Sequence, residues 1–270
     1  MTAPALAAYD LTGRTAVVTG AGSGIGRATA VLLGSCGASV LCADIDGTSA
    51  GITSAHIESE GGAAWSTAVD VARREEIEGA IDEAVTRTGR IDILANVAGI
   101  GEQMTALADV DDVILERVLA VNLKGTFYGC RAAAQIMSKQ GVGNIVNVAS
   151  SVVDTPEVTG LTCYGMSKAG VVQLTRSLAH ELGPSGVRVN AVAPGFILTP
   201  HSSRHFTDAA GRIDEEHRDR FLKRFRDVSP LGEIGDPTDV AHAILYLASD
   251  ASRFVTGQVL RPNGGQAMPG

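Results

Sequence analysis

The sequence predicts an α/β fold: a Rossmann-like, doubly wound parallel sheet of about seven strands with helices on both faces. The chain has 270 residues, of which 45% are hydrophobic, and this size suits one large core. Short, almost continuously apolar runs, such as TAVVT at 15–19 and SVLCA at 39–43, are typical of strands buried on both faces. Helical patterns separate these runs, and a repeated strand-then-helix order implies right-handed crossovers between parallel strands.

The expected elements follow one another along the whole chain. Strands are expected at Thr15–Thr19, Ser39–Ala43, Ala63–Val69, Ile91–Ala95, Asn144–Ala149, Arg188–Ala193 and Gln258–Arg261. Helices are expected near 25–36, 47–59, 73–88, 109–138, 162–182 and 237–248. Because no repeat or low-complexity linker divides this order, we expect residues 1–270 to form a single domain.

Residues 200–228 break the alternation, because they lie between the sixth and seventh expected strands and are too polar for the core. They mix seven basic with six acidic residues, so that their charges nearly cancel. A long insertion in a compact domain is usually a lid or a binding loop. We expect this segment to be either a substrate-side lid or a pair of solvated surface helices.

The composition argues against several classes of function. The net charge of −8 and the lack of any basic run argue against a nucleic-acid partner, which needs clustered Lys and Arg. The four cysteines form no CxxC pair and no histidines have metal-ligand spacing, so we expect reduced thiols and no metal site. Neither a signal peptide nor an apolar run of about 20 residues is present, so the expected location is the cytoplasm, with no membrane partner.

A glycine-rich turn, TGAGSGIG at 19–26, follows the first expected strand. Glycine lets the backbone approach a pyrophosphate closely, and the helix that follows offers unpaired N–H groups and a partial positive charge at its N-terminus. The position of the motif after an apolar strand makes it more specific than its spacing alone. It predicts a phosphate-binding turn for a dinucleotide, formed by Gly20, Ser23, Gly24, Ile25 and Gly26.

The second expected strand runs directly into Asp44. A carboxylate at this point accepts hydrogen bonds from the hydroxyls of an adenosine ribose and would repel a 2′-phosphate. No Lys or Arg occurs between Ala43 and Glu60, and Ser23 in the glycine-rich turn is not basic. The sequence therefore favours NAD over NADP as the cofactor.

The most specific pattern is YGMSK at 164–168, in an expected helix. Residues i and i+4 share one face of a helix, so Tyr164 and Lys168 are expected to project together. A free phenol has a pKa of about 10, and an adjacent ammonium favours the phenolate. Tyr164 can then act as general base in alcohol oxidation and as general acid in ketone reduction. Ser151 follows an apolar strand, at the sheet edge where such folds bind ligands.

Together these motifs resemble the classical type of the short-chain dehydrogenase/reductase family, over nearly the whole chain. The combination is specific although each part alone is not. The likeness rests on the glycine-rich turn, Asp44, NVAG at 96–99, Asn122 in AVNLKG, Ser151, YGMSK at 164–168 and VTGQVLRPNGG at 255–265.

The resemblance implies a role for each matching residue. Tyr164 would be the acid/base, and Lys168 would lower its pKa and hold the nicotinamide ribose. Ser151 would hydrogen-bond the substrate oxygen, and Asn122 would help to position a water in a proton relay. Further cofactor contacts implied in the same way are Asp70, Val71, Asn96, Ala98, Gly99, Pro194, Gly195 and Thr199.

The activity implied is that of an NAD-dependent alcohol dehydrogenase or ketoreductase, which moves a hydride between nicotinamide and a secondary alcohol or ketone. Three alternatives stay open: a reductase of 3-oxoacyl thioesters, a non-catalytic nucleotide-binding regulator of the same fold, and a related enzyme that uses bound NAD for a net non-redox step such as epimerisation. The resemblance also implies a homotetramer, and the wide apolar surfaces of the expected helices around 126–137 and 165–182 favour a partner. Asp154 stands where the family often has glycine, and we expect it on the substrate side.

Overall fold

In the computed structural model, which describes residues 4–102, 104–155, 159–203, 206–207 and 212–269, seven strands form one parallel sheet. Their order across the sheet is β3-β2-β1-β4-β5-β6-β7. The strands are β1 Thr15–Thr19, β2 Ser39–Asp44, β3 Ala63–Ala68, β4 Ile93–Asn96, β5 Gly143–Val148, β6 Val187–Val192 and β7 Val259–Leu260. The predicted doubly wound sheet is confirmed, and every strand begins and ends within two residues of its expected bounds.

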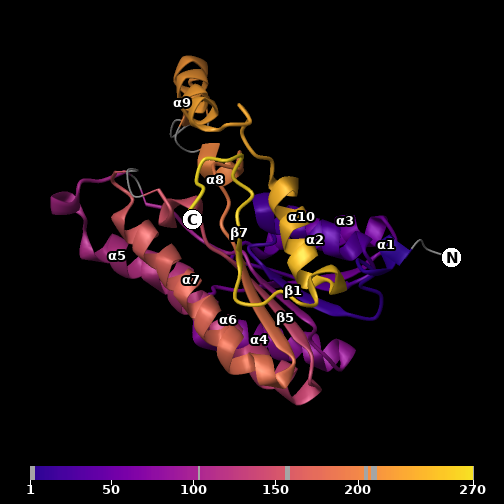
Figure 1. Cartoon of the computed structure of the whole chain (residues 1–270). Helices are drawn as coiled ribbons and strands as arrows, with labels where there is room; N and C mark the ends of the chain where they lie inside the picture. Colours follow the sequence, from indigo (N-terminus) through magenta and orange to yellow (C-terminus); the bar gives the residue numbers. More distant parts are fainter. Residues whose placement is uncertain (1–3, 103, 156–158, 204–205, 208–211, 270) are drawn as a thin grey trace.

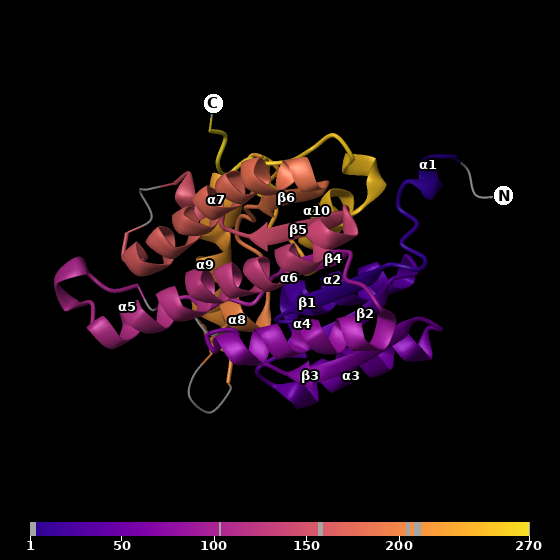
Figure 2. The same ribbon diagram turned by 90° about the horizontal axis from the view of Figure 1, so that it is seen from below.

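Helices cover both faces of the sheet (Figure 1, Figure 2). One face carries α2 Gly24–Ser35, α3 Gly47–Ser59 and α10 Pro237–Ala248, and the other carries α4 Arg74–Thr88, α6 Thr126–Gln140 and α7 Thr162–Leu182. The central strand β1 serves both layers, because Ala16 and Val18 pack into the first and Val17 packs into the second. In the part of the chain that is described, no helix combines the length and the apolar character that crossing a membrane requires.

The connection from β4 to β5 contains the helix expected near 109–138, but the type of helix changes along its length. It consists of α5 Asp112–Leu119, a π-helical segment Ala120–Gly125, and α6. Within the π-helical segment the Asn122 side chain exchanges two hydrogen bonds with the backbone of Ile100, at 2.8 and 2.9 Å. The Thr126 hydroxyl donates to the Asn122 carbonyl oxygen at 2.7 Å. The chain is thus helical from Asp112 to Gln140, close to the expected range, with a wider turn in the middle of the kind often found at functional sites.

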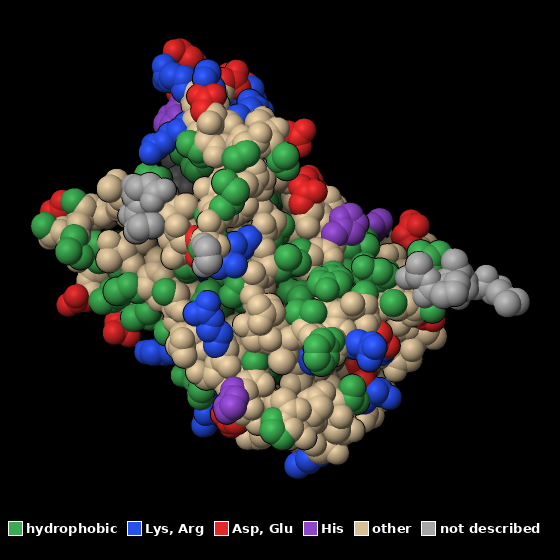
Figure 3. Space-filling model, viewed as in Figure 1, with side chains coloured by type: hydrophobic (Ala, Val, Ile, Leu, Met, Phe, Trp, Pro, Cys, Tyr) green, Lys and Arg blue, Asp and Glu red, His purple; other side chains and the backbone are tan. Residues whose placement is uncertain are grey.

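The segment 200–228 contains α8 Pro200–Ser203 and α9 Glu215–Val228, while its residues 204–205 and 208–211 lie outside the described part. Figure 1 places α9 at the end of the molecule, and Figure 3 shows charged side chains crowding its outer surface. Its opposite face is apolar, since Phe225 stacks on Phe196 with ring centroids 4.0 Å apart. The outer face of α9 is therefore that of a solvated surface helix. Closure of α9 over the site as a lid stays a prediction.

The apolar residues of α6 and α7 pack mostly inside the chain. Ala133, Ala134 and Met137 belong to the core between the sheet and the layer formed by α4, α6 and α7, as does Ala179. Leu174, Leu178 and Leu182 are partly buried against the same cluster. The wide apolar surface of these helices is therefore used by the chain's own core, and it does not by itself indicate a partner. Exposed apolar side chains remain at Phe127, which is 41% exposed, and Met166, which is 50% exposed.

Candidate active site

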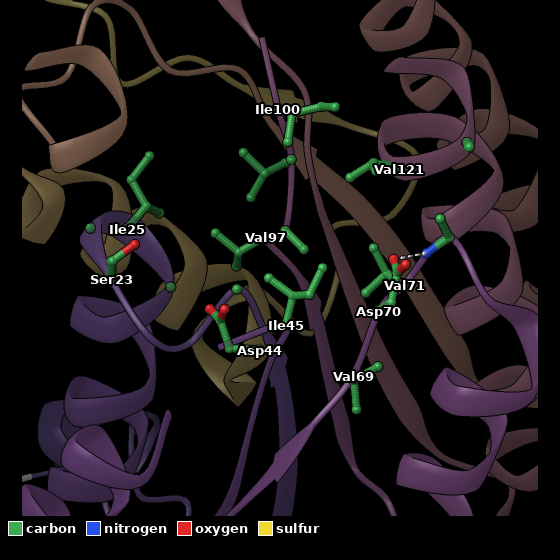
Figure 4. Close-up of a pocket in the computed structure, with 18 of the residues that line it drawn as sticks. Ser23, Ile25, Asp44, Ile45, Val69, Asp70, Val71, Val97, Ile100 and Val121 are labelled. Carbon is green, nitrogen blue, oxygen red and sulfur yellow. Dashed lines mark hydrogen bonds between the residues drawn. The ribbon is translucent and has the colours of Figure 1, made fainter. Parts of the chain in front are cut away.

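The glycine-rich turn between β1 and α2 forms one wall of a cavity of about 490 Å³ (Figure 4). Gly20 has φ of +69°, and a Cβ built there would lie 3.0 Å from the Ala98 backbone. A Cβ at Gly26 would overlap the Gly20 carbonyl oxygen. Ser23 precedes α2 without a side-chain capping hydrogen bond, so its side chain leaves the first N–H groups of α2 open to a ligand. A glycine-rich backbone turn at a helix N-terminus suits a pyrophosphate.

Asp44 lies between the glycine-rich turn and the loop that carries Asp70 (Figure 4). The Asp44 carboxylate is held by two backbone donors, Gly22 N–H at 2.8 Å and Asp46 N–H at 2.9 Å. Its neighbour Ile45 also lines the cavity and is 74% exposed. The carboxylate is therefore fixed at the cavity wall, at the end of β2, where the ribose of an adenosine would lie.

Most of the predicted cofactor residues line this same cavity. They are Gly20, Ser23, Gly24, Ile25, Gly26, Asp44, Asp70, Val71, Ala98, Gly99, Tyr164, Lys168 and Thr199. The structure places three others elsewhere. Pro194 and Gly195 line a second, adjacent cavity. The Asn96 amide is buried in the sheet and donates to Asn147 Oδ1 at 2.9 Å.

Tyr164 and Lys168 project from the same face of α7 into the first cavity, as their spacing predicts. The Lys168 side chain is 3% exposed, and its ammonium lies 5.7 Å from the centroid of the Tyr164 ring. Lys168 Nζ donates to the Val148 carbonyl oxygen at 2.7 Å. Burial lowers the pKa of Lys168 to about 8. The ammonium therefore predominates at neutral pH, and it stands beside the phenol.

Asn122 and Lys168 both lie against Gly99, in the loop after β4. A Cβ built at Gly99 would lie 3.3 Å from both Asn122 Oδ1 and Lys168 Nζ. Asn122 is fully buried, and its amide also donates to Ser167 Oγ on α7 at 3.0 Å. The π-helical segment, the loop and α7 thus meet at one point beside the ammonium.

A second cavity, of about 390 Å³, adjoins the first and is lined by both Ser151 and Tyr164. Ser151 begins a short 3₁₀ turn after β5, and its backbone N–H donates to the Pro194 carbonyl oxygen at 2.8 Å. Four residues line both cavities: Ile25, Val148, Tyr164 and Thr199. Tyr164 therefore stands at the junction, with the glycine-rich turn and Asp44 in one cavity and Ser151 in the other.

Two acidic residues of this region differ from what the sequence suggested. Asp154, expected on the substrate side, instead forms an ion pair with Arg261 at 2.8 Å and lines neither cavity. No local pattern in the sequence indicates this ion pair, because Arg261 lies 107 residues further along the chain. Glu102, which the motifs did not single out, is 5% exposed and lines the second cavity. Its only signal in the sequence is an acid three residues after Gly99.

Comparisons with known proteins agree with this arrangement. A family model described as enoyl-(acyl carrier protein) reductase matches residues 20–267. A 3-oxoacyl-(acyl-carrier-protein) reductase from Thermotoga maritima is 40% identical over 257 residues, which cover 94% of this chain and 98% of that protein. A (3R)-3-hydroxyacyl-CoA dehydrogenase from Mus musculus is 37% identical over 262 residues, with 94% and 96% covered.

Solved structures give the same result. A short-chain type dehydrogenase/reductase from Mycobacterium marinum superposes with a TM-score of 0.87 at 32% identity, covering 98% of this chain and 99% of that one. A 7α-hydroxysteroid dehydrogenase complexed with NADH superposes with a TM-score of 0.88 at 30% identity, covering 99% of each. The chain belongs to the short-chain dehydrogenase/reductase family and is an oxidoreductase that uses a nicotinamide cofactor.

Proposed function

We propose that this chain is an NAD-dependent dehydrogenase that moves a hydride between nicotinamide and a secondary alcohol or ketone. The observation that carries the proposal is the place of Tyr164, which lines both cavities and has the Lys168 ammonium 5.7 Å from its ring. The nicotinamide, when bound, supplies the site that accepts or gives the hydride. The cradle from Gly20 to Gly26, Asp44, Val71 and Thr199 would hold the cofactor.

The chain's own residues would manage the proton. In oxidation, the Tyr164 phenolate accepts the proton of the substrate hydroxyl, and in reduction the phenol gives it back. The Lys168 ammonium favours the phenolate by its charge. The Ser151 hydroxyl donates a hydrogen bond to the substrate oxygen and stabilises the negative charge that develops there. Asn122, beside Lys168, would help to position a water in a proton relay, as the likeness to the family implies.

The preference for NAD rests on charge at the adenosine end of the first cavity. Asp44 lines it, and neither Ser23 nor Ile45 carries a positive charge. The nearby Arg27 guanidinium already donates to the Gly22 carbonyl oxygen and to Thr53 Oγ1. A 2′-phosphate at this end would therefore meet the negative charge of Asp44, and the Arg27 guanidinium nearby is already bound to two oxygen acceptors.

A second candidate function is the reduction of 3-oxoacyl thioesters. The relatives from Thermotoga maritima and Mus musculus carry names of this chemical class. Arg224 of α9 lines the second cavity, and no described residue forms an ion pair with it. An arginine in that place suits the phosphates of a thioester carrier. Turnover of acetoacetyl-CoA above that of simple ketones would favour this candidate.

We also propose a cytoplasmic homotetramer. The free thiols of Cys36, Cys42, Cys130 and Cys163 suit a reducing compartment. The exposed side chains of Phe127 on α6 and Met166 on α7 support an interface on these helices.

The proposed activity is tested by a spectrophotometric screen at 340 nm. Secondary alcohols are offered with NAD and, in parallel, with NADP, and ketones are offered with each reduced cofactor. We expect turnover of at least one secondary alcohol, with kcat/KM for NAD at least about 10-fold above that for NADP, because Asp44 repels the extra phosphate. A preference for NADP would refute the role given to Asp44, and no turnover of any alcohol or ketone would refute the activity.

A further inference from the structure

Asp154 directly follows the 3₁₀ turn Ser151–Val153 and forms a two-pronged ion pair with Arg261. Arg261 Nε donates to Asp154 Oδ2 at 2.8 Å, and Arg261 Nη2 donates to Oδ1 at 3.3 Å. The Asp154 side chain is 11% exposed and the Arg261 side chain is 26% exposed. A bidentate pair of this kind fixes the relative orientation of its two groups as well as attracting them. It stands where the family often has a glycine, which forms no such pair.

The Ser151 hydroxyl depends on the backbone of its turn for its position. Within the ranges that the structure describes, no residue exchanges a hydrogen bond with this hydroxyl. The hydroxyl is thus available to a substrate oxygen, but no hydrogen bond holds the side chain itself. A group that stabilises developing charge works only when it is held within about 0.5 Å of its productive place. The turn must therefore be held firmly by other contacts.

The backbone of Ser151 is held on two sides. Its N–H donates to the Pro194 carbonyl oxygen at 2.8 Å. Its carbonyl oxygen accepts the backbone N–H of Asp154 at 2.9 Å and the hydroxyl of Thr155 at 3.0 Å. The second side therefore rests on Asp154, and the side chain of Asp154 is in turn held by Arg261.

Arg261 connects the turn to the edge of the sheet. Its Nη1 donates to the carbonyl oxygen of Val259 at 2.9 Å, and Val259 belongs to β7, which pairs with β6. The carbonyl oxygen of the next residue, Pro262, accepts the Gly195 N–H at 3.2 Å. The same C-terminal segment thus anchors the stretch that accepts the Ser151 N–H.

We propose that Asp154 is a positioning residue: paired with Arg261, it fixes the turn that places the Ser151 hydroxyl against the substrate oxygen. The proposal rests on the proposed function, in which Ser151 stabilises the charge on that oxygen. Since Asp154 lines neither cavity, it acts through Ser151 and not by touching the substrate. Loss of the pair lets the turn shift, and a donor displaced by about 1 Å loses much of its effect on the transition state.

The substitution Asp154→Asn removes the charge of the pair and keeps the size of the side chain. A double-mutant cycle with Ser151→Ala is the test, because a residue that acts through the Ser151 hydroxyl has nothing to act on once that hydroxyl is gone. Arg261→Lys, which keeps the charge and loses the planar fork, is the second variant. Asp250→Asn makes the same chemical change in the ion pair of Asp250 with Arg14, outside both cavities, and is the matched control.

The cycle measures kcat at saturating NAD for cyclohexanol or for the secondary alcohol turned over fastest in the 340 nm screen. We expect Asp154→Asn to lower kcat by about 10-fold, because misplacing a donor costs part of what its removal costs. In the Ser151→Ala background the same substitution is expected to change kcat by less than about twofold. Arg261→Lys is expected to show the same pattern to a smaller extent, and Asp250→Asn to leave kcat unchanged. The Kd for NAD is expected to stay within about threefold throughout.

Hydrogen exchange gives a second readout, which needs no turnover. The N–H groups of Ser151 and Asp154 are both hydrogen-bonded within the region that the pair holds. Asp154→Asn is expected to speed exchange in peptides that cover 149–155 by about 10-fold and to leave the central strands unchanged. An enzyme that turns over no alcohol contradicts the proposed function, and the exchange rates still show whether the pair holds the turn.

Two results would overturn the proposal. One is an Asp154→Asn variant with the kcat of the wild type. The other is an equal loss of kcat in the wild-type and Ser151→Ala backgrounds, which is the signature of a general structural role. If Asp154→Asn does not fold, the same comparison with Arg261→Lys decides between these outcomes. A Ser151→Ala variant with undiminished kcat contradicts the role given to Ser151 itself, and with it the positioning role of Asp154.

Discussion

Tyr164→Phe is expected to lower kcat for oxidation of a secondary alcohol by about 10²- to 10⁴-fold, the usual contribution of a positioned proton-transfer group. The variant keeps the aromatic ring at the junction of the two cavities and removes only the hydroxyl that exchanges the proton. The walls that would bind the cofactor are otherwise unchanged. We therefore expect the Kd for NAD, measured by calorimetry, to stay within about threefold of the wild-type value.

Tyr128→Phe provides the matched control for that experiment. Tyr128 lies on α6, outside the residues that line either cavity, so loss of its hydroxyl should leave kcat unchanged. The account would be contradicted if Tyr164→Phe retained more than about a tenth of the wild-type kcat, or if Tyr128→Phe lost as much activity as Tyr164→Phe.

Asp44→Asn is expected to shift the ratio of kcat/KM for NAD to that for NADP by about 100-fold toward NADP. Two effects act in the same direction. The neutral amide loses charge-assisted hydrogen bonds to the ribose, which weakens NAD by about 10-fold or more. It also removes the repulsion of a 2′-phosphate, which strengthens NADP. The measurement is steady-state kinetics with each cofactor, at saturating alcohol.

The neighbouring Asp46 offers a stringent control for this change. It is exposed, caps the start of α3 through Thr48 and Ser49, and does not line the cavity. Asp46→Asn removes the same charge only two residues away. An unchanged cofactor ratio in Asp44→Asn, or an equal shift in Asp46→Asn, would show that Asp44 does not select the cofactor.

Most of the fold could be predicted from the sequence, because the sheet is buried on both faces. Strands such as β1 must then be apolar throughout, and helices must separate them, so both the class and the strand bounds were readable. Most residues that line the first cavity could also be predicted from the sequence. The local patterns are a glycine-rich turn, an acid at the end of β2, and Tyr164 one turn before Lys168. The fold brings them together at one edge of the sheet.

What the sequence could not show depends on contacts between distant segments. The π-helical turn at Asn122 exists because its side chain is held by Ile100, 22 residues away. The ion pair between Asp154 and Arg261 spans 107 residues. Glu102 caps a helix that begins 60 residues later, and no local motif announces it. Such pairings are set by tertiary packing, which periodicity and spacing do not encode.

The most direct test of the central claim is the pH dependence of kcat/KM for alcohol oxidation in the wild type and in Lys168→Met, at saturating NAD. Oxidation requires the phenolate, so the rate rises with pH as Tyr164 loses its proton. The buried Lys168, whose own pKa is about 8, is charged at neutral pH and favours the phenolate. The account predicts a midpoint well below 10 in the wild type and a midpoint near or above 10 in Lys168→Met. Equal midpoints in the two proteins would contradict it.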